Sequence, residues 1–281
     1  MIAALFIRRS LLSLWLALVA ATVFAQAQPA QKPFEPQVGQ EGKDVIWVPT
    51  PQALVEKMMD MAKVTANDYV IDLGSGDGRT VITAAKRGAR ALGIEYNPDM
   101  VELSRLNAAK EGLSGKASFM KADIFESDFS QATVITMYLL PQLNVKLRPK
   151  ILNLKPGTRI VSHAFTMEEW TADQTDSFDG RTAYLWIVPA KVAGTWRLPQ
   201  GELTLKQNFQ MIAGTLKTGG NTLAVANGKL NGDQISFGAG NSEYTGRVNG
   251  NTIQGTVKGG SSGNWNATRV GKSSAAAPAK Y

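Results

Sequence analysis

The residues best suited to chemistry in this chain form a glycine-rich loop with an acid in front of it. The loop is Gly74-Ser75-Gly76-Asp77-Gly78, and it follows directly on the short apolar run 69–73, which contains Asp72. Glycines let a chain turn sharply and let a ligand approach bare backbone. A helix that begins after such a loop also offers unpaired N–H groups. The pattern therefore predicts a binding site for a polar ligand at residues 72–78.

Two more acids occur where later strands should end. Glu95 closes an apolar run and is followed by Tyr96, whereas Asp123 and Ile124 come just after the run 117–121. An acid at the end of the second strand can bind the two hydroxyls of a ribose, and an acid after the third strand can reach the edge of an adenine. A glycine loop with acids at three successive strand ends is a more specific signal than the loop alone.

The spacing of the glycines separates two cofactor classes. A dinucleotide-binding fold has the pattern G-x-G-x-x-G, in which the third glycine allows close helix packing. Here Arg79 occupies that third position, and the spacing is G-x-G-x-G instead. The loop therefore departs from the dinucleotide pattern.

Strands and helices must alternate to position these loops, and the sequence predicts that they do. We expect strands at residues 69–73, 91–95, 117–121, 132–138, 158–163 and 182–188, and helices at 51–61, 80–87, 97–111 and 143–154. Thr50-Pro51 and Asn97-Pro98 are typical helix starts, because the polar residue can cap and proline suits the first turn. The alternation predicts a Rossmann-like α/β domain with a mostly parallel sheet over residues 45–192.

The periodicity changes to two from Gly194 onwards, which predicts a second, all-β part. We expect short strands at 194–196, 202–205, 211–216, 223–225, 234–237, 244–248, 252–257 and 264–269. Asn231-Gly232 and Asn249-Gly250 are strong hairpin signals. The pattern predicts an antiparallel meander or small barrel at residues 193–270 that folds separately, and the Ala/Ser-rich residues 271–281 predict a disordered tail.

The N-terminus has the pattern of a targeting segment. Arg8 and Arg9 precede the uncharged apolar run 11–24, and small residues suited to cleavage follow. Residues 1–25 therefore predict a signal peptide and a periplasmic location, with no stable membrane insertion after its removal. An uncleaved membrane anchor and a cytoplasmic enzyme remain the alternatives. The Gln- and Pro-rich residues 26–44 predict a linker.

Composition excludes several kinds of site. The chain has no cysteine and a single histidine, so disulfides, thiolate chemistry and a histidine-rich metal site are excluded. The net charge of +7 is scattered, without a long run of Lys or Arg, so a nucleic-acid partner is not indicated.

At this point a family resemblance can be named. Residues 70–79 (VIDLGSGDGR), 93–98 (GIEYNP) and 121–124 (KADI) resemble the cofactor motifs of class I S-adenosylmethionine-dependent methyltransferases. Residues 48–51 (VPTP) and 138–144 (YLLPQLN) resemble the protein-lysine methyltransferases of the archaeal broad-specificity and mitochondrial FAM173 type. The signal segment and the C-terminal β part depart from that family.

The resemblance implies a cofactor, site residues and a partner. The cofactor is S-adenosyl-L-methionine, and the residues implied to bind it are Asp72, Gly74, Ser75, Gly76, Asp77, Gly78, Glu95, Tyr96, Asp123 and Ile124. Tyr138 lies where the methyl acceptor is usually placed, and His163, which ends the fifth strand, is a second candidate catalytic residue. The acceptor implied is a lysine side chain of a protein. The alternative function is a non-catalytic exported binding protein that keeps the fold, since fold does not fix function.

Overall fold

The computed structural model describes residues 34–199 and 201–271 of this chain. The expected signal peptide, the first part of the expected linker and residues 272–281 of the expected tail lie outside the described residues. No helix in the described part is both long and apolar enough to span a bilayer. Two parts are distinguished below: the sheet domain, residues 45–192, and the barrel, residues 193–270.

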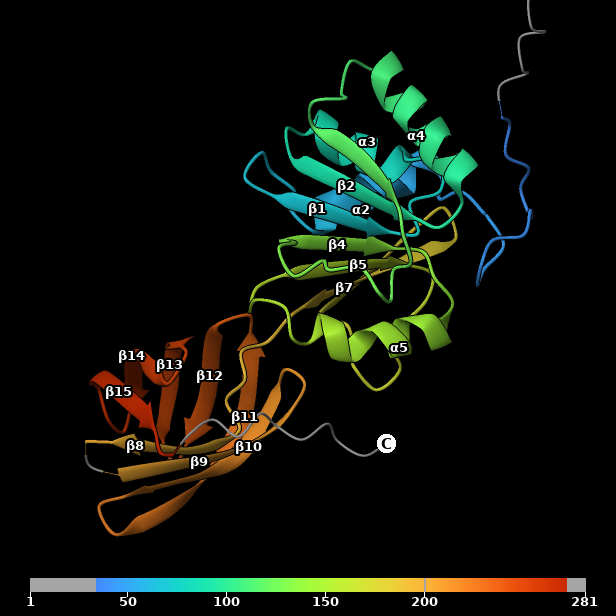
Figure 1. The fold of residues 1–281 in the computed structure, drawn as a ribbon. Coiled ribbons are helices and arrows are strands. Elements are labelled where there is room, and N and C mark those ends of the chain that lie inside the picture. Colours follow the sequence, from blue (N-terminus) through green and yellow to red (C-terminus); the bar gives the residue numbers. More distant parts are fainter. Residues whose placement is uncertain (1–33, 200, 272–281) are drawn as a thin grey trace, which may run out of the picture. The chain divides into compact units, whose positions relative to one another are not determined.

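The sheet domain is built on a seven-stranded sheet with the order β3-β2-β1-β4-β5-β7-β6 (Figure 1). Its strands are β1 (Tyr69–Leu73), β2 (Arg90–Glu95), β3 (Ala117–Lys121), β4 (Val134–Met137), β5 (Arg159–His163), β6 (Gln174–Phe178) and β7 (Arg181–Ile187). Strands β3, β2, β1, β4 and β5 pair in parallel, whereas β7 is antiparallel to both of its neighbours. The expected mostly parallel α/β sheet is confirmed.

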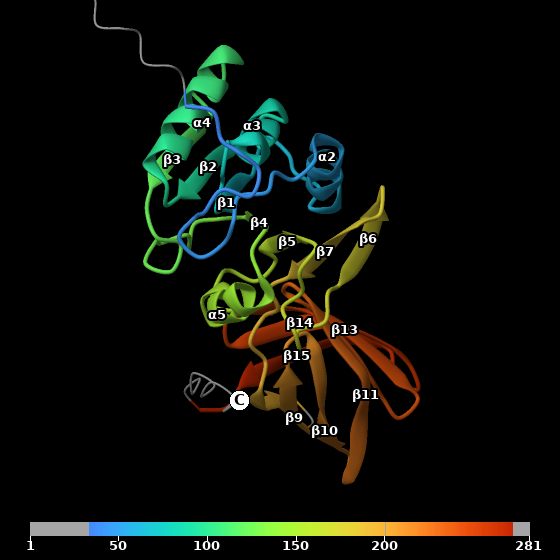
Figure 2. The ribbon, with the colours of Figure 1, turned by 90° about the vertical axis from the view of Figure 1, so that its right-hand side faces the viewer.

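One strand was missing from the expectation. Strand β6 lies at the edge of the sheet, paired only with β7 (Figure 2). Its sequence, QTDSF, is exposed at four of five positions. A solvated edge strand has no buried face, so it lacks the apolar alternation by which strands are recognised.

Helices cover both faces of the sheet, and each face has its own core. The helices are α2 (Gln52–Met61), α3 (Arg79–Lys86), α4 (Pro98–Lys110) and α5 (Pro141–Ile151). Val70 packs in a core with residues of α2, α3 and α4, whereas the next residue, Ile71, packs in a second core with Leu147 and Ile151 of α5. Side chains alternate across a strand, so these two cores lie on opposite faces of the sheet.

The helix starts explain how the strand ends are held in place. Asn97 caps α4, because its side chain accepts hydrogen bonds from the amides of Asp99 (2.9 Å) and Met100 (3.5 Å). The expectation that Thr50 caps α2 is wrong: the helix begins after Pro51 with no side-chain cap. The Thr50 hydroxyl instead lies 3.0 Å from Nδ1 of His163.

The barrel is a closed antiparallel sheet of eight strands. They are β8 (Gly194–Leu198), β9 (Gly201–Asn208), β10 (Met211–Thr218), β11 (Asn221–Asn231), β12 (Gln234–Ala239), β13 (Ser242–Asn249), β14 (Thr252–Gly259) and β15 (Gly263–Arg269). The first and last strands meet, with Trp196 paired to Arg269, as the sequence predicted. An eight-stranded barrel has an interior just wide enough for side chains to fill.

Aromatic rings fill the interior of this barrel. Phe237 and Tyr244 stack with ring centroids 4.9 Å apart, and Trp265 packs edge-on against both at 5.8 and 5.5 Å. The indole N–H of Trp265 donates to the carbonyl oxygen of Thr245 at 2.9 Å, so its one polar group is satisfied. These tryptophan contacts are those of a packed core.

Replacing Trp265 by alanine should destabilise the barrel by about 3–5 kcal/mol, because it leaves a large cavity among the aromatic rings. Urea unfolding followed by circular dichroism measures this change. Asn266→Ala is the matched control, since Asn266 is the exposed neighbour on the same strand, and it should change stability by less than ~0.5 kcal/mol. Equal effects of the two substitutions would contradict the packed interior.

Candidate functional site

The glycine loop is fixed against the neighbouring strand. The amides of Gly74 and Ser75 both donate to the carbonyl oxygen of Ile94 on β2, at 2.9 and 3.1 Å. Gly78 has a φ of +82° at the start of α3, and a Cβ there would come within 2.8 Å of the Phe119 ring. The third glycine is therefore needed for close packing of α3, although its spacing differs from the dinucleotide pattern.

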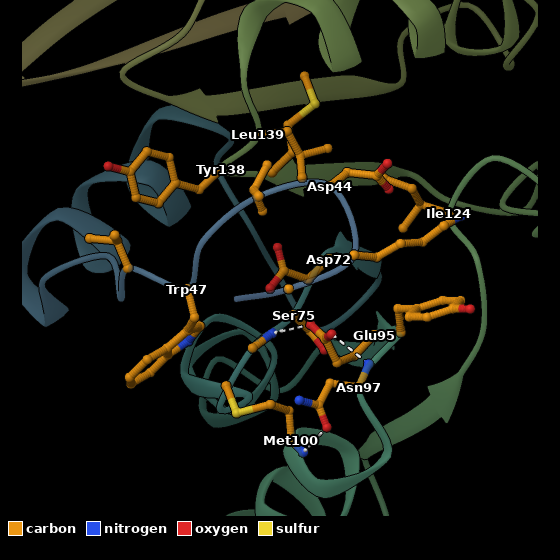
Figure 3. Close-up of a pocket in the computed structure, with 18 of the residues that line it drawn as sticks. Asp44, Trp47, Asp72, Ser75, Glu95, Asn97, Met100, Ile124, Tyr138 and Leu139 are labelled. Carbon is orange, nitrogen blue, oxygen red and sulfur yellow. Dashed lines mark hydrogen bonds between the residues drawn. The ribbon is translucent and has the colours of Figure 1, made fainter. Parts of the chain in front are cut away.

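Glu95 joins the loop to the end of β2. One of its carboxylate oxygens accepts a hydrogen bond from the amide of Gly76 at 3.0 Å, and the other accepts from the amide of Asn97 at 2.9 Å (Figure 3). Each carboxylate oxygen can accept more than one hydrogen bond. Both oxygens therefore keep acceptor capacity for a diol, which is what a ribose presents.

Asp72 lies deeper in the same site. It is only 6% exposed, and it accepts a hydrogen bond of 2.6 Å from the hydroxyl of Thr136 on β4. Burial, reinforced by the negative charges of Glu95 and Asp77, raises the pKa of Asp72 to about 7. A cationic ligand group placed beside it would favour the carboxylate form.

Asp123 has a partner that the sequence did not suggest. It forms an ion pair with Lys43, and this hydrogen bond lowers the pKa of Asp123 from its ordinary value. The Lys43 ammonium also lies 5.0 Å from the centre of the Tyr96 ring. The expected adenine-side acid and aromatic ring are thus both in contact with one lysine.

Lys43 belongs to a segment, residues 40–50, that we call the strap. All of its residues line the same cavity as the glycine loop. Trp47 of the strap lies over Gly76, where a Cβ would come within 2.7 Å of the indole nitrogen (Figure 3). The prediction of a plain linker at residues 26–44 therefore fails for residues 40–44, because composition signals flexibility but not a contact with a distant loop.

The remaining predicted cofactor residues lie around the same cavity, whose volume is about 300 Å³ and so at the lower end for ligand pockets. The structure brings together Asp72, Gly74, Ser75, Gly76, Asp77, Glu95, Tyr96, Asp123 and Ile124 as lining residues. Gly78 is not among them; its part is the packing against Phe119. The carboxylate of Asp77 is bound by Arg79, whose guanidinium also donates to the Thr50 carbonyl oxygen at 3.0 Å.

The acceptor side of the cavity is aromatic. Tyr138, just after β4, and Phe165, just after β5, both line it, and their rings stack at a centroid distance of 5.9 Å. The sequence analysis did not select Phe165. A signal existed, since Phe165 follows a strand end just as Tyr138 does.

His163 lies against Tyr138 rather than at the cavity wall. Their ring centroids are 3.9 Å apart, and the imidazole is 3% exposed. Burial, aided by the charge of Arg181, lowers the pKa of His163 to about 4. The imidazole is therefore neutral near pH 7, and a base that weak contributes little to proton abstraction. This placement suits a packing role behind Tyr138 better than a catalytic one.

S-adenosylmethionine fits the residues present. It contains an adenine and a ribose, and it carries a sulfonium and an ammonium cation. Glu95 retains acceptors for the ribose, Tyr96 and Ile124 line the cavity beside Asp123, and Asp72 supplies a buried acid. Carboxyl groups on a cavity wall favour a cation over an anion. No group of three or more potential metal ligands was found in the part of the chain that the structure describes.

Comparison with known proteins gives a consistent set of matches. A family model described as the ANTKMT methyltransferase domain matches residues 72–174. A protein-lysine N-methyltransferase of Saccharolobus islandicus is 43% identical over 151 residues, which cover 51% of this chain and 94% of that protein. An ATP synthase lysine N-methyltransferase of Mus musculus is 33% identical over 169 residues, covering 60% of this chain and 68% of that protein.

A solved structure is also similar. It is the crystal structure of an RNA methyltransferase from Salinibacter ruber in complex with S-adenosyl-L-homocysteine. It shares 48% sequence identity and a TM-score of 0.51, and it covers 52% of this chain and 96% of that chain.

Replacing Glu95 by alanine should weaken binding of S-adenosylmethionine by about 1.5–3 kcal/mol, the range for hydrogen bonds to a charged group. Isothermal titration calorimetry on the purified variant measures this loss. Glu102→Ala, on the half-exposed side of α4, is the control and should bind as the unchanged protein does. Normal affinity in a folded Glu95→Ala variant would remove Glu95 from the site.

Cofactor affinity should depend on pH through Asp72. Its pKa of about 7 means that the carboxyl is mostly neutral at pH 6 and mostly charged at pH 7.5, and a cation binds better to the charged form. Affinity should therefore rise close to tenfold between about pH 6 and about pH 7.5, before the ligand's own ammonium group begins to lose its proton near pH 8. Titrations in Asp72→Asn should give a weaker and nearly flat profile. A profile as steep as that of the unchanged protein would assign the titration to another group.

Proposed function

This chain belongs to the class I S-adenosylmethionine-dependent methyltransferases, in the family that includes protein-lysine N-methyltransferases, and we propose that its methyl acceptor is a lysine side chain of a protein. The observation that carries the proposal is the 43% identity to a protein-lysine N-methyltransferase across 94% of that relative's length. The aromatic side of the cavity supports it, because an apolar, aromatic channel suits the long methylene chain of lysine.

The chemistry asks little of the protein beyond alignment and desolvation. When bound, S-adenosylmethionine supplies an electrophilic methyl group on a sulfonium. Tyr138 and Phe165 form the aromatic wall beside the site, where they exclude water and orient an incoming chain. An apolar wall also disfavours the charged ammonium and so favours the neutral, nucleophilic amine. Holding two reactants at attack distance is itself a large part of the rate enhancement.

Transfer to RNA is the second candidate, because the similar solved structure is described as an RNA methyltransferase. The two functions differ in what they ask of the protein surface. RNA binding depends on phosphate contacts from a basic patch, whereas the side chains nearest the cofactor site include the acids Asp44, Asp77 and Glu95. The charge of the site favours a cationic acceptor over a polyanion.

Labelled S-adenosylmethionine separates these candidates. The purified protein is incubated with the labelled cofactor and a protein-and-RNA extract, and the products are treated with protease or ribonuclease. We expect protease-sensitive label that hydrolysis releases as methyl-lysine. Ribonuclease-sensitive label would favour RNA, and cofactor binding without any transfer would favour a non-catalytic binding protein.

Tyr138→Ala should lower transfer to lysine by about tenfold or more, because it removes half of the aromatic wall that aligns the acceptor. Tyr138→Phe keeps the ring and should retain most of the activity. Cofactor affinity, measured by calorimetry, should change little in either variant, since the ribose acid and the glycine loop are untouched. If Tyr138→Ala transferred methyl groups at the full rate, the acceptor would not pass beside this ring.

A further inference from the structure

The barrel contains one turn whose residue conflicts with its conformation. Strands β9 and β10 are joined by the two residues Phe209 and Gln210, and Phe209 has a φ of +52°. Glycine is the usual residue at such a hairpin position. A bulky residue in the left-handed region carries strain, and strain of this kind persists where the surroundings impose it, often at functional sites.

Contacts outside the barrel account for the phenylalanine. Its ring stacks on Trp170 of the sheet domain, with centroids 5.8 Å apart and planes within 11°, and Trp170 is fully buried. Next to it, Gln210 donates from Nε2 to the carbonyl oxygen of Thr171 at 2.8 Å. Both parts belong to the same compact unit of the chain. The strained turn thus serves a contact with the sheet domain rather than the closure of the barrel.

Trp170 and Thr171 end a segment that begins at the cavity. We call this segment, residues 164–171, the acceptor loop, because it carries Phe165 of the aromatic wall. The loop begins with a second strained residue, Ala164, at a φ of +64°. The amide of Phe165 donates back to the carbonyl oxygen of His163 at 2.8 Å. This tight turn aims Phe165 into the cavity beside Tyr138.

Helix α5 holds the acceptor loop from its other side. Buried Asn144 donates from Nδ2 to the carbonyl oxygens of Phe165 (3.3 Å) and Thr166 (3.0 Å). Arg148 donates to the carbonyl oxygen of Met167 at 2.7 Å, and its guanidinium also lies 5.4 Å from the centre of the Phe209 ring. The loop is therefore clamped between α5 and the barrel turn.

The turn is in turn anchored to the connection between the two parts. Gln207 donates from Nε2 to the carbonyl oxygens of Phe209 (2.8 Å) and Ala190 (2.9 Å), and its Oε1 accepts from the amide of Val192 at 2.7 Å. Three hydrogen bonds from one side chain thus fix where Phe209 stands relative to the end of the sheet domain. The expectation that residues 193–270 fold separately holds for the aromatic core of the barrel but not for this turn.

We propose that the barrel is a positioning element of the methyltransferase: Phe209 and Gln210 brace the acceptor loop and so set the position of Phe165 in the acceptor channel. The proposal rests on the proposed function only in calling this side of the cavity the acceptor side. Phe209 is a positioning residue, because it acts through Trp170 and the loop and does not line the cavity.

Phe209→Gly tests this role, since it should relieve the strain in the turn while removing the brace. We expect the barrel to stay folded, as judged by unchanged circular dichroism. Hydrogen exchange of amides in residues 164–171 should become about tenfold faster, as in a local opening, while amides of the glycine loop stay protected. Cofactor affinity should be unchanged, and the KM for a lysine-bearing acceptor protein should rise several-fold. Phe209→Trp keeps a stacking ring and should restore both properties.

Asn227→Gly is the matched control, because Asn227 also has a positive φ in the barrel, at +50°, but is exposed on β11. It should leave exchange in the acceptor loop unchanged. If Phe209→Gly also left loop exchange unchanged, the brace would be overturned, whatever the acceptor. If Phe209→Gly unfolded the protein, Gln210→Glu, which loses the donor to Thr171, would give the same readings. Faster loop exchange in a protein that methylates no lysine would keep the brace and reject the proposed acceptor.

Discussion

The hydrogen bond from the Gly76 amide to the carboxylate of Glu95 is the contact on which the site depends. It joins the loop after β1 to the end of β2, and the second oxygen of Glu95 reaches the amide of Asn97, the cap of α4. One side chain therefore sets two strand ends and a helix start at the same edge of the sheet. A parallel sheet makes this possible, because all its carboxyl ends gather at that edge.

Charge is the second constraint. The site keeps several acids close together, and one of them, Asp72, is buried beside Thr136. Burying a carboxylate among other negative charges is unfavourable, which is why its pKa is raised to about 7. A ligand with positive charge offsets that cost on binding. The fold thus holds part of its unfavourable electrostatic energy at the place where a sulfonium cofactor is expected.

The other half of the site is apolar, and its rigidity comes from farther away. Tyr138 is supported by His163, which burial keeps neutral and which Thr50 holds by its Nδ1 atom. Phe165 lies on a loop with two left-handed residues other than glycine, Ala164 and Glu168. Conformations of this kind persist only when contacts on every side impose them. The contacts come from α5 on one side and from the barrel on the other.

The sequence by itself determined the glycine loop, the acids at the strand ends, the cap at Asn97 and the hairpins at Asn231-Gly232 and Asn249-Gly250. Each of these is a local signal, because the residue types and the conformation they favour lie within a few positions of each other. From them the α/β class, the cofactor family and the closing of a β part by its first and last strands could all be predicted.

Only the tertiary structure decided which distant side chains meet. Lys43 pairs with Asp123 across 80 positions, and Thr50 reaches His163 across 113. No local pattern encodes a partner so far along the chain, so Lys43 was taken for part of a linker and Thr50 for a cap. The same holds for Phe209, which in sequence is an ill-suited hairpin residue. Its reason is visible only where the ring stacks on Trp170, because packing between two parts of a fold can outweigh a local conformational preference.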